Sequence, residues 1–192
     1  MALEGLAAIH ARIAEIEGLG AGAPTTPPIA PSSNDTATSF ATALNAAQTT
    51  GSGSTQQFLS AALAQRGKPY VWGANAPIND PNPKAFDCSE LTKWAAAQAG
   101  VSIPDGAAPQ YVYLRDHGTL MSVDQALHTP GALLFHFDRE PRRAGDFQPH
   151  DHVAISLGDG VHTIEAKGSK YGTGVFEAGT HFNYAGVIPG LS

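Results

Sequence analysis

The stretch AFDCSELTKW, residues 85–94, contains the only cysteine in a chain of 192 residues. Asp87 is a favourable N-cap residue, and Glu90 stands three positions later, where a capping box has its acidic side chain. Apolar residues then recur at helical spacing until Gly100, a residue type that commonly ends helices. The pattern therefore predicts a helix that begins at Cys88.

A cysteine in the first turn of a helix has two interpretations. The free amides of that turn and the positive end of its dipole favour a thiolate, which would make the Cys88 sulfur a nucleophile. The negative charge of Glu90 in the same turn opposes this effect, and a lone cysteine is more often a small buried hydrophobic residue. A base close to the thiol is needed to decide between the two.

The composition limits the classes of function. A single cysteine permits no internal disulfide and provides no cysteine pair of the kind that holds structural zinc. The net charge of -6 argues against a nucleic-acid or anionic-membrane surface, because both need clustered lysine and arginine. Apolar stretches such as residues 131–137 are too short to span a bilayer, and the N-terminal sequence lacks the basic start of a secretory signal peptide. We therefore expect no membrane span and a non-standard route if the protein is exported.

Changes of composition divide the chain into three parts. Residues 1–19 are predicted to form a short amphipathic helix that needs a docking partner, because it is too short to be stable alone. Its apolar residues at helical spacing are Leu6, Ile9, Ile13 and Ile16. Residues 20–55 are rich in Ala, Pro, Thr and Ser with almost no charge, which is typical of a flexible linker. The folded domain is expected to span residues 56–192.

Within this domain the helical patterns come first and the strand patterns afterwards. A helix is expected in QQFLSAALAQRG, residues 56–67, and a second one begins at Cys88. A long loop from Val101 to Ala126 is expected to follow and to lead to the apolar segment TPGALLFHF. The strand patterns are HVAISL (152–157), VHTIEA (161–166), TGVFEA (173–178) and YAGVIPG (184–190), with GDG at 158–160 as a tight hairpin turn. This order predicts an α+β fold.

The first of these strands offers a base for the thiol. Val153, Ile155 and Leu157 form its apolar face, so His152 is expected on the other face, beside small residues that would leave room for a substrate. Glu165, on the returning strand, is the candidate to orient the imidazole, since a carboxylate that accepts a hydrogen bond from the ring fixes its tautomer. A glutamate that only faces solvent is the alternative.

A metal site is an alternative interpretation of the same segment. His150, Asp151 and His152 could hold zinc in principle. Their spacing and the absence of a further well-spaced ligand disfavour this interpretation. We therefore expect no metal site, and a surface role for His150.

Five segments together resemble the NlpC family of cell-wall cysteine peptidases in their order and approximate separations. They are KPYVWGA (68–74), FDCSEL (86–91), PGALLF (130–135), HDHVAISLGDG (150–160) and TIEAKG (163–168). The resemblance covers about residues 56–192 and implies a compact papain-like fold in which the nucleophile starts a helix packed on an antiparallel sheet. It also implies cofactor-independent hydrolysis of peptidoglycan stem peptides, typically between D-glutamate and diaminopimelate or lysine.

The resemblance assigns roles to residues that match the family motifs. They are the nucleophile Cys88, the base His152, the third polar residue Glu165, the tyrosine near the sulfur Tyr70, and the stem-peptide contacts Asp87 and Ser89. The amide of Cys88 is expected to stabilise the oxyanion, with the Tyr70 hydroxyl assisting. Two residues depart from the family pattern: Glu90 replaces a usual glycine, and Ala132 a usual aspartate. Trp72 is expected to pack in the core.

We therefore expect a peptidoglycan endopeptidase that acts on the wall, on the periplasmic or extracellular side. An N-acetylmuramoyl-L-alanine amidase of the same fold is an alternative. From another class, the chain could be a non-enzymatic assembly component that docks a larger machine through residues 1–19. The front end weakly resembles the leader of wall-lytic proteins of actinobacterial flagellar systems, and a phage-borne lysin or tail enzyme is the competing setting.

Overall fold

The computed structural model describes residues 53–191. The predicted helix of residues 1–19 and most of the predicted linker, up to residue 52, lie outside the described residues. Helix α3 spans Gly53–Leu63 and begins before the predicted boundary at residue 56. Its buried apolar residues are those of the predicted face: Phe58, Leu59, Ala62 and Leu63.

Helix α4 spans Cys88–Gln98 and begins where the sequence predicts. Asp87 caps it, because its Oδ1 accepts a hydrogen bond of 2.8 Å from the amide of Glu90. A capping box also requires the Glu90 side chain to accept a hydrogen bond from the backbone amide of Asp87, and this part of the prediction is wrong. The buried carboxylate of Glu90 instead accepts a hydrogen bond of 2.9 Å from the amide of Ala76 and forms an ion pair with Lys93. Glu90 therefore ties a preceding loop to the helix.

The predicted long loop between residues 101 and 126 is wrong, because two helices and a short strand lie there. They are α5 (Ala107–Asp116), β1 (Leu120–Met121) and α6 (Val123–Leu127). Gly106 and Pro109 obscure the start of α5 in the sequence. A proline in the first turn costs little, however, since the amides of that turn have no partner within the helix.

Within residues 53–191, six antiparallel strands form one sheet in the order β1-β6-β2-β3-β4-β5. The remaining strands are β2 (Leu133–His136), β3 (His152–Ser156), β4 (His162–Ala166), β5 (Thr173–Glu177) and β6 (Tyr184–Gly186). The four predicted strands and the hairpin turn are confirmed. Gly158 in that turn has φ of 79°, and a Cβ there would lie 2.4 Å from Pro130, so the turn requires glycine.

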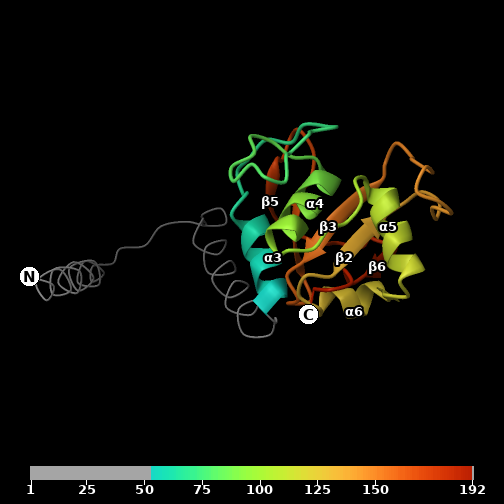
Figure 1. Cartoon of the computed structure of the whole chain (residues 1–192). Coiled ribbons are helices and arrows are strands. Elements are labelled where there is room, and N and C mark those ends of the chain that lie inside the picture. The colour runs from blue at the N-terminus through green and yellow to red at the C-terminus, as the bar shows by residue number, and fades with distance from the viewer. Residues whose placement is uncertain (1–52, 192) are drawn as a thin grey trace, which may run out of the picture. The chain divides into compact units, whose positions relative to one another are not determined.

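The sheet is entirely antiparallel and most helices precede its main strands in the chain, which confirms the α+β class, and helices cover both of its faces. Helices α3, α4 and α5 share a buried apolar cluster with Val153 and Ile155 of β3, and Figure 1 shows α3 and α4 side by side. Helix α6 packs on the opposite face in a second cluster that contains Ala154. None of the helices among residues 53–191 has the length and apolar character needed to cross a membrane.

The small residues beside His152 on β3 were expected to leave room for a substrate, and this expectation is wrong. Ala154 and Ser156 are completely buried. The hydroxyl of Ser156 donates a hydrogen bond of 3.1 Å to the carbonyl of Leu127 in α6. These small residues make room for α6 and not for a substrate chain.

Candidate active site

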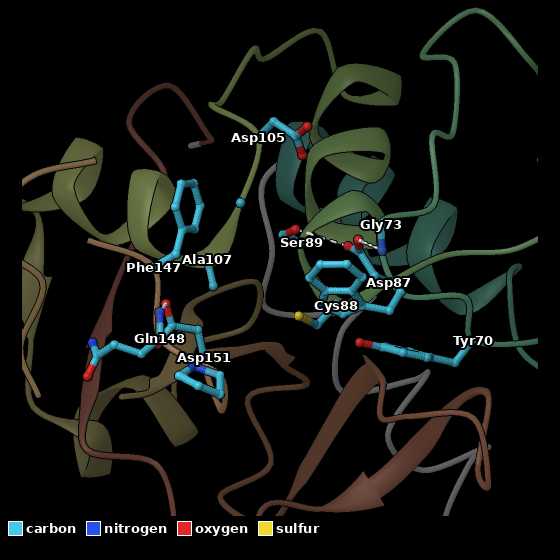
Figure 2. Close-up of a pocket in the computed structure, with 13 residues that line it drawn as sticks. Tyr70, Gly73, Asp87, Cys88, Ser89, Asp105, Ala107, Phe147, Gln148 and Asp151 are labelled. Atoms are coloured by element: carbon cyan, nitrogen blue, oxygen red, sulfur yellow. Dashed lines mark hydrogen bonds between the residues drawn. The ribbon is translucent and has the colours of Figure 1, made fainter. Parts of the chain in front are cut away.

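Cys88 lies at the wall of a cavity of about 560 Å³, and its own exposure is only 9%. Figure 2 shows its sulfur directed into this space from the start of α4. The other walls come from the segments 70–73 and 105–107 and from the loop between β2 and β3. The nucleophile candidate is therefore in reach of a bound molecule although most of its surface is covered.

The structure brings His152 and Glu165 together at the same place. The Nε2 of His152 lies 2.5 Å from Oε2 of Glu165, and the thiol of Cys88 interacts with the imidazole. Because Nε2 is directed to the carboxylate, the other ring nitrogen is left for the sulfur. The three residues form a chain from thiol to imidazole to carboxylate.

Glu165 is held as a carboxylate although its side chain is fully buried. Burial alone would raise the pKa of Glu165, but the hydrogen bond and charge of His152 outweigh it and the pKa is lowered. Thr163 donates a hydrogen bond of 2.9 Å to Oε1, and the Lys167 ammonium lies 3.4 Å from the same atom. Every contact of this carboxylate therefore favours its charged form.

The pKa of His152 is shifted in the opposite direction to that of Glu165. Burial would lower the pKa of its imidazole, but the interactions with Cys88 and Glu165 are stronger and raise the pKa to about 9. These interactions therefore favour the cationic form of the ring. A cation at this position stabilises an adjacent thiolate and holds the proton that a leaving group needs.

Tyr70 lies across the nucleophile from the loop between β2 and β3, and Figure 2 shows its hydroxyl directed toward Cys88. Burial, followed by the charges of Cys88 and Asp87, raises the pKa of Tyr70 to about 12. The hydroxyl therefore stays protonated and can donate a hydrogen bond to an anion beside the sulfur. A backbone bridge to Phe86 fixes this segment next to the start of α4.

Asp87 and Ser89 also line the cavity, but their polar atoms have partners within the protein. Oδ1 of Asp87 accepts hydrogen bonds from the Ser89 hydroxyl at 3.0 Å and the Glu90 amide at 2.8 Å. Oδ2 accepts one of 3.1 Å from the amide of Gly73. These bonds position the nucleophile and the neighbouring segment. A contact with a stem peptide stays a prediction for both residues.

The expectation that Trp72 packs in the core is wrong, because its side chain is 86% exposed at the cavity. On the other side of the cavity, Phe147 is 69% exposed. Sequence reasoning did not find Phe147, Gln148 or Asp105 as cavity residues. They lie in loops without a periodic pattern, so the sequence carries no local signal for them.

His150 and Ala132 both lie outside the cavity lining. His150 is exposed, and its Nδ1 pairs with Oδ2 of Asp138 at 3.0 Å and so turns to a neighbouring strand end. Within residues 53–191 no three His, Cys, Asp or Glu side chains are grouped so that they could hold a metal ion. Ala132 is buried in the cluster beneath α6, outside the cavity lining.

The helices and the antiparallel sheet form a papain-like fold, with a thiol at a helix start near an imidazole and a buried carboxylate. Residues 67–180 match the sequence model of the NlpC/P60 family, which is more than half of the chain. The chain belongs to the NlpC/P60 family.

Two named relatives match about half of this chain. The bifunctional muramidase/DL-endopeptidase CwlT of Bacillus subtilis is 32% identical over 99 residues, which are 52% of this chain and 25% of CwlT. The probable endopeptidase p60 of Listeria monocytogenes is 36% identical over 106 residues, which are 55% of this chain and 18% of p60. The chain thus matches only a quarter or less of the length of these relatives.

Solved structures agree on the fold. The NlpC/p60 domain of the peptidoglycan hydrolase SagA is 30% identical with a TM-score of 0.52, over 70% of this chain and 98% of that domain. RipD of Mycobacterium tuberculosis, a non-catalytic NlpC/p60 protein adapted to peptidoglycan binding, has a TM-score of 0.54 at 22% identity, over 71% of this chain and 98% of that chain. The fold alone therefore does not decide between catalysis and binding.

Proposed function

We propose that the protein is a cysteine endopeptidase that cleaves the stem peptides of bacterial peptidoglycan. The observation that carries this proposal is the pairing of the His152 imidazole with the buried carboxylate of Glu165 beside the Cys88 thiol, which lies at the wall of a cavity. A domain that only binds has no need for a paired thiol, imidazole and carboxylate. Their presence favours catalysis over the binding role.

The proposed reaction has two stages. The Cys88 sulfur attacks the scissile carbonyl carbon, and the oxyanion receives hydrogen bonds from the Cys88 amide and the Tyr70 hydroxyl. The His152 imidazolium gives its proton to the leaving amine, and a thioester remains on the sulfur. Water then attacks the thioester with His152 as the base, which releases the carboxylic acid and restores the thiol.

Glu165 acts on the imidazole and not on the substrate. Its charge stabilises the imidazolium in both stages, and the bond to Nε2 keeps the other ring nitrogen directed to the sulfur. Since a carboxylate does this as well as a second histidine would, the proposed third residue is chemically competent.

The substrate class comes from the relatives that are named endopeptidases and from the resemblance of the motifs. We propose the bond between D-glutamate and diaminopimelate or lysine, and a place of action at the cell wall. The amidase reaction, between the lactyl group and L-alanine, remains the rival within the same fold.

Mass analysis of the soluble products from purified peptidoglycan of known stem peptides tests the proposal, with Cys88→Ala as the inactive control. The endopeptidase produces fragments with a new amino group on the third stem residue. An amidase instead releases whole stem peptides that begin with L-alanine. Absence of any product that depends on Cys88 would overturn the proposal.

A further inference from the structure

Trp72 is the largest exposed apolar side chain next to the proposed site. Its indole is 86% exposed and lines the cavity that contains Cys88. Tryptophan is usually mostly buried, because its ring is large and apolar. An exposed aromatic surface at the mouth of a cavity is a feature of ligand sites.

The backbone that carries Trp72 is fixed on both sides of the residue. The amide of Val71 donates a hydrogen bond of 3.0 Å to the carbonyl of Phe86, and the amide of Gly73 donates one of 3.1 Å to Asp87. Both acceptors immediately precede the nucleophile Cys88. The indole is thus carried by a backbone fixed to the start of α4, which lowers the entropy cost of binding a ligand.

A second aromatic side chain stands on another wall of the same cavity. Phe147 is 69% exposed, and a Cβ on Gly106 would lie 3.3 Å from its ring, so the ring rests on the backbone at the start of α5. Figure 2 shows Phe147 on the other side of Cys88 from Gly73 and Tyr70. The cavity therefore has an apolar platform on each of two walls.

The cavity lining carries the carboxylates of Asp87, Asp105 and Asp151, which offer hydrogen-bond acceptors. Lysine and arginine are missing from its lining, so the lining itself has no ammonium or guanidinium group. Both oxygens of Asp87 already accept hydrogen bonds, and Asp105 lies 3.4 Å from the Lys93 ammonium. Aromatic faces combined with carboxylate acceptors suit a ring that has an apolar face and hydroxyl groups at its edge. A pyranose sugar has this chemistry.

We propose that Trp72 binds a sugar of the glycan strand, so that the enzyme cleaves stem peptides joined to the glycan faster than free stem peptides. This inference rests on the proposed function. The proposed bond lies two residues from the lactyl group of the sugar, and two extended residues span about 7 Å. A stem peptide with its scissile bond at Cys88 therefore places the sugar near the mouth of the cavity.

An ammonium group over the indole is the rival ligand, because cations also bind aromatic faces. A free stem peptide has an ammonium at its L-alanine end, where the glycan-linked peptide has a neutral amide. The two ligands therefore predict opposite substrate preferences.

The test compares kcat/KM for a disaccharide tetrapeptide with kcat/KM for the free tetrapeptide of the same sequence. For the wild type we expect a ratio of about ten in favour of the disaccharide form. Trp72→Ala should bring this ratio close to one, and Trp72→Phe should give an intermediate value. A lower folded fraction cancels in the ratio, because both substrates are measured on the same sample.

Tyr171→Ala is the matched control, since Tyr171 is also an exposed aromatic residue but lies outside the cavity lining. It should keep the wild-type ratio. A wild-type ratio of one, or an unchanged ratio in Trp72→Ala, would overturn the inference alone. Preference for the free peptide would overturn it in favour of the ammonium. Cleavage of neither substrate would overturn the proposed function and this inference with it.

Discussion

The Nε2 atom of His152 lies 2.5 Å from the Oε2 atom of Glu165, a carboxylate with no exposed side-chain surface. The two residues belong to neighbouring antiparallel strands of one hairpin. The geometry of the sheet therefore sets the distance between them and also fixes which ring nitrogen faces the thiol. The consequences of this pairing can be measured both in activity and in stability.

Glu165→Gln should reduce kcat by about 10- to 100-fold, because the amide still bonds to the ring but no longer stabilises its cationic form. Since Glu165 helps to raise the pKa of His152 to about 9, the pH-rate profile should also shift to lower pH. Steady-state rates between pH 5 and 10 check both results. Glu177→Gln, at the exposed end of β5, is the control for the loss of one charge. An unshifted profile would contradict the role given to Glu165.

The same pairing predicts that stability depends on pH. The pKa of His152 is raised from 6.5 to about 9 on folding, so its contribution is complete below 6.5 and is lost as the pH rises through about 9. Glu165 has a lowered pKa, so its contribution is lost only as the pH falls into the acid range. The free energy of unfolding should therefore decrease by roughly 1–3 kcal/mol between pH 6 and 10. Urea titrations of the wild type and His152→Gln at several pH values measure this decrease. If the free energy of unfolding depends equally on pH in both proteins, the prediction is refuted.

Cys88→Ala should abolish hydrolysis without unfolding the protein, because the thiol is small and lies at a cavity wall. As the only cysteine, Cys88 also gives a clean labelling experiment. Iodoacetamide should modify the wild type once, and faster than it modifies a free thiol at neutral pH, whereas His152→Ala should slow the reaction. Mass spectrometry over time measures both rates. Wild-type hydrolysis by Cys88→Ser would be incompatible with the nucleophile assignment.

Local signals explain which parts of the fold the sequence predicts. The cap at Asp87 and the glycine turn at residues 158–160 each act within a few positions, so the start of α4 and the β3–β4 hairpin are predicted correctly. Alternation along two strands likewise indicates the faces of His152 and Glu165. The register of one hairpin is enough to bring His152 and Glu165 within 2.5 Å of each other. For this reason three residues of the candidate site could be proposed from the sequence.

The surroundings of the site depend on contacts between distant segments. The cavity forms where residues 70–73, 105–107 and 147–151 meet at the start of α4, and no short pattern encodes this meeting. Trp72 is exposed because its neighbours in the chain bond to residues 86 and 87. Composition alone would place such a residue in the core. The residues on the substrate-facing side of the site therefore could not be predicted from the sequence.

Tyr70→Phe should reduce kcat by about 100-fold and leave KM nearly unchanged, because the hydroxyl is proposed to act on the oxyanion and not on the bound ground state. The pKa of Tyr70 is raised to about 12, so the loss should be the same from pH 6 to 9. Steady-state kinetics at three pH values check this expectation. Retention of the wild-type kcat would limit Tyr70 to a packing role.

The position of α3 predicts where the chain can be shortened. Phe58 and Leu59 of this helix are buried in the main apolar cluster, whereas the residues that form the site all follow them in the chain. A protein that begins at Gly53 should therefore keep the wild-type kcat/KM on soluble muropeptides and nearly the same melting temperature.

Removal of residues 1–59 is the contrasting deletion. It deletes the two buried apolar side chains of Phe58 and Leu59, each of which contributes about 2–5 kcal/mol, and should unfold the domain or lower its melting temperature strongly. Thermal denaturation and the soluble-substrate assay on both shortened proteins measure this contrast. Lost activity in the protein that begins at Gly53 would show that residues 1–52 belong to the catalytic unit, contrary to the proposed division of the chain.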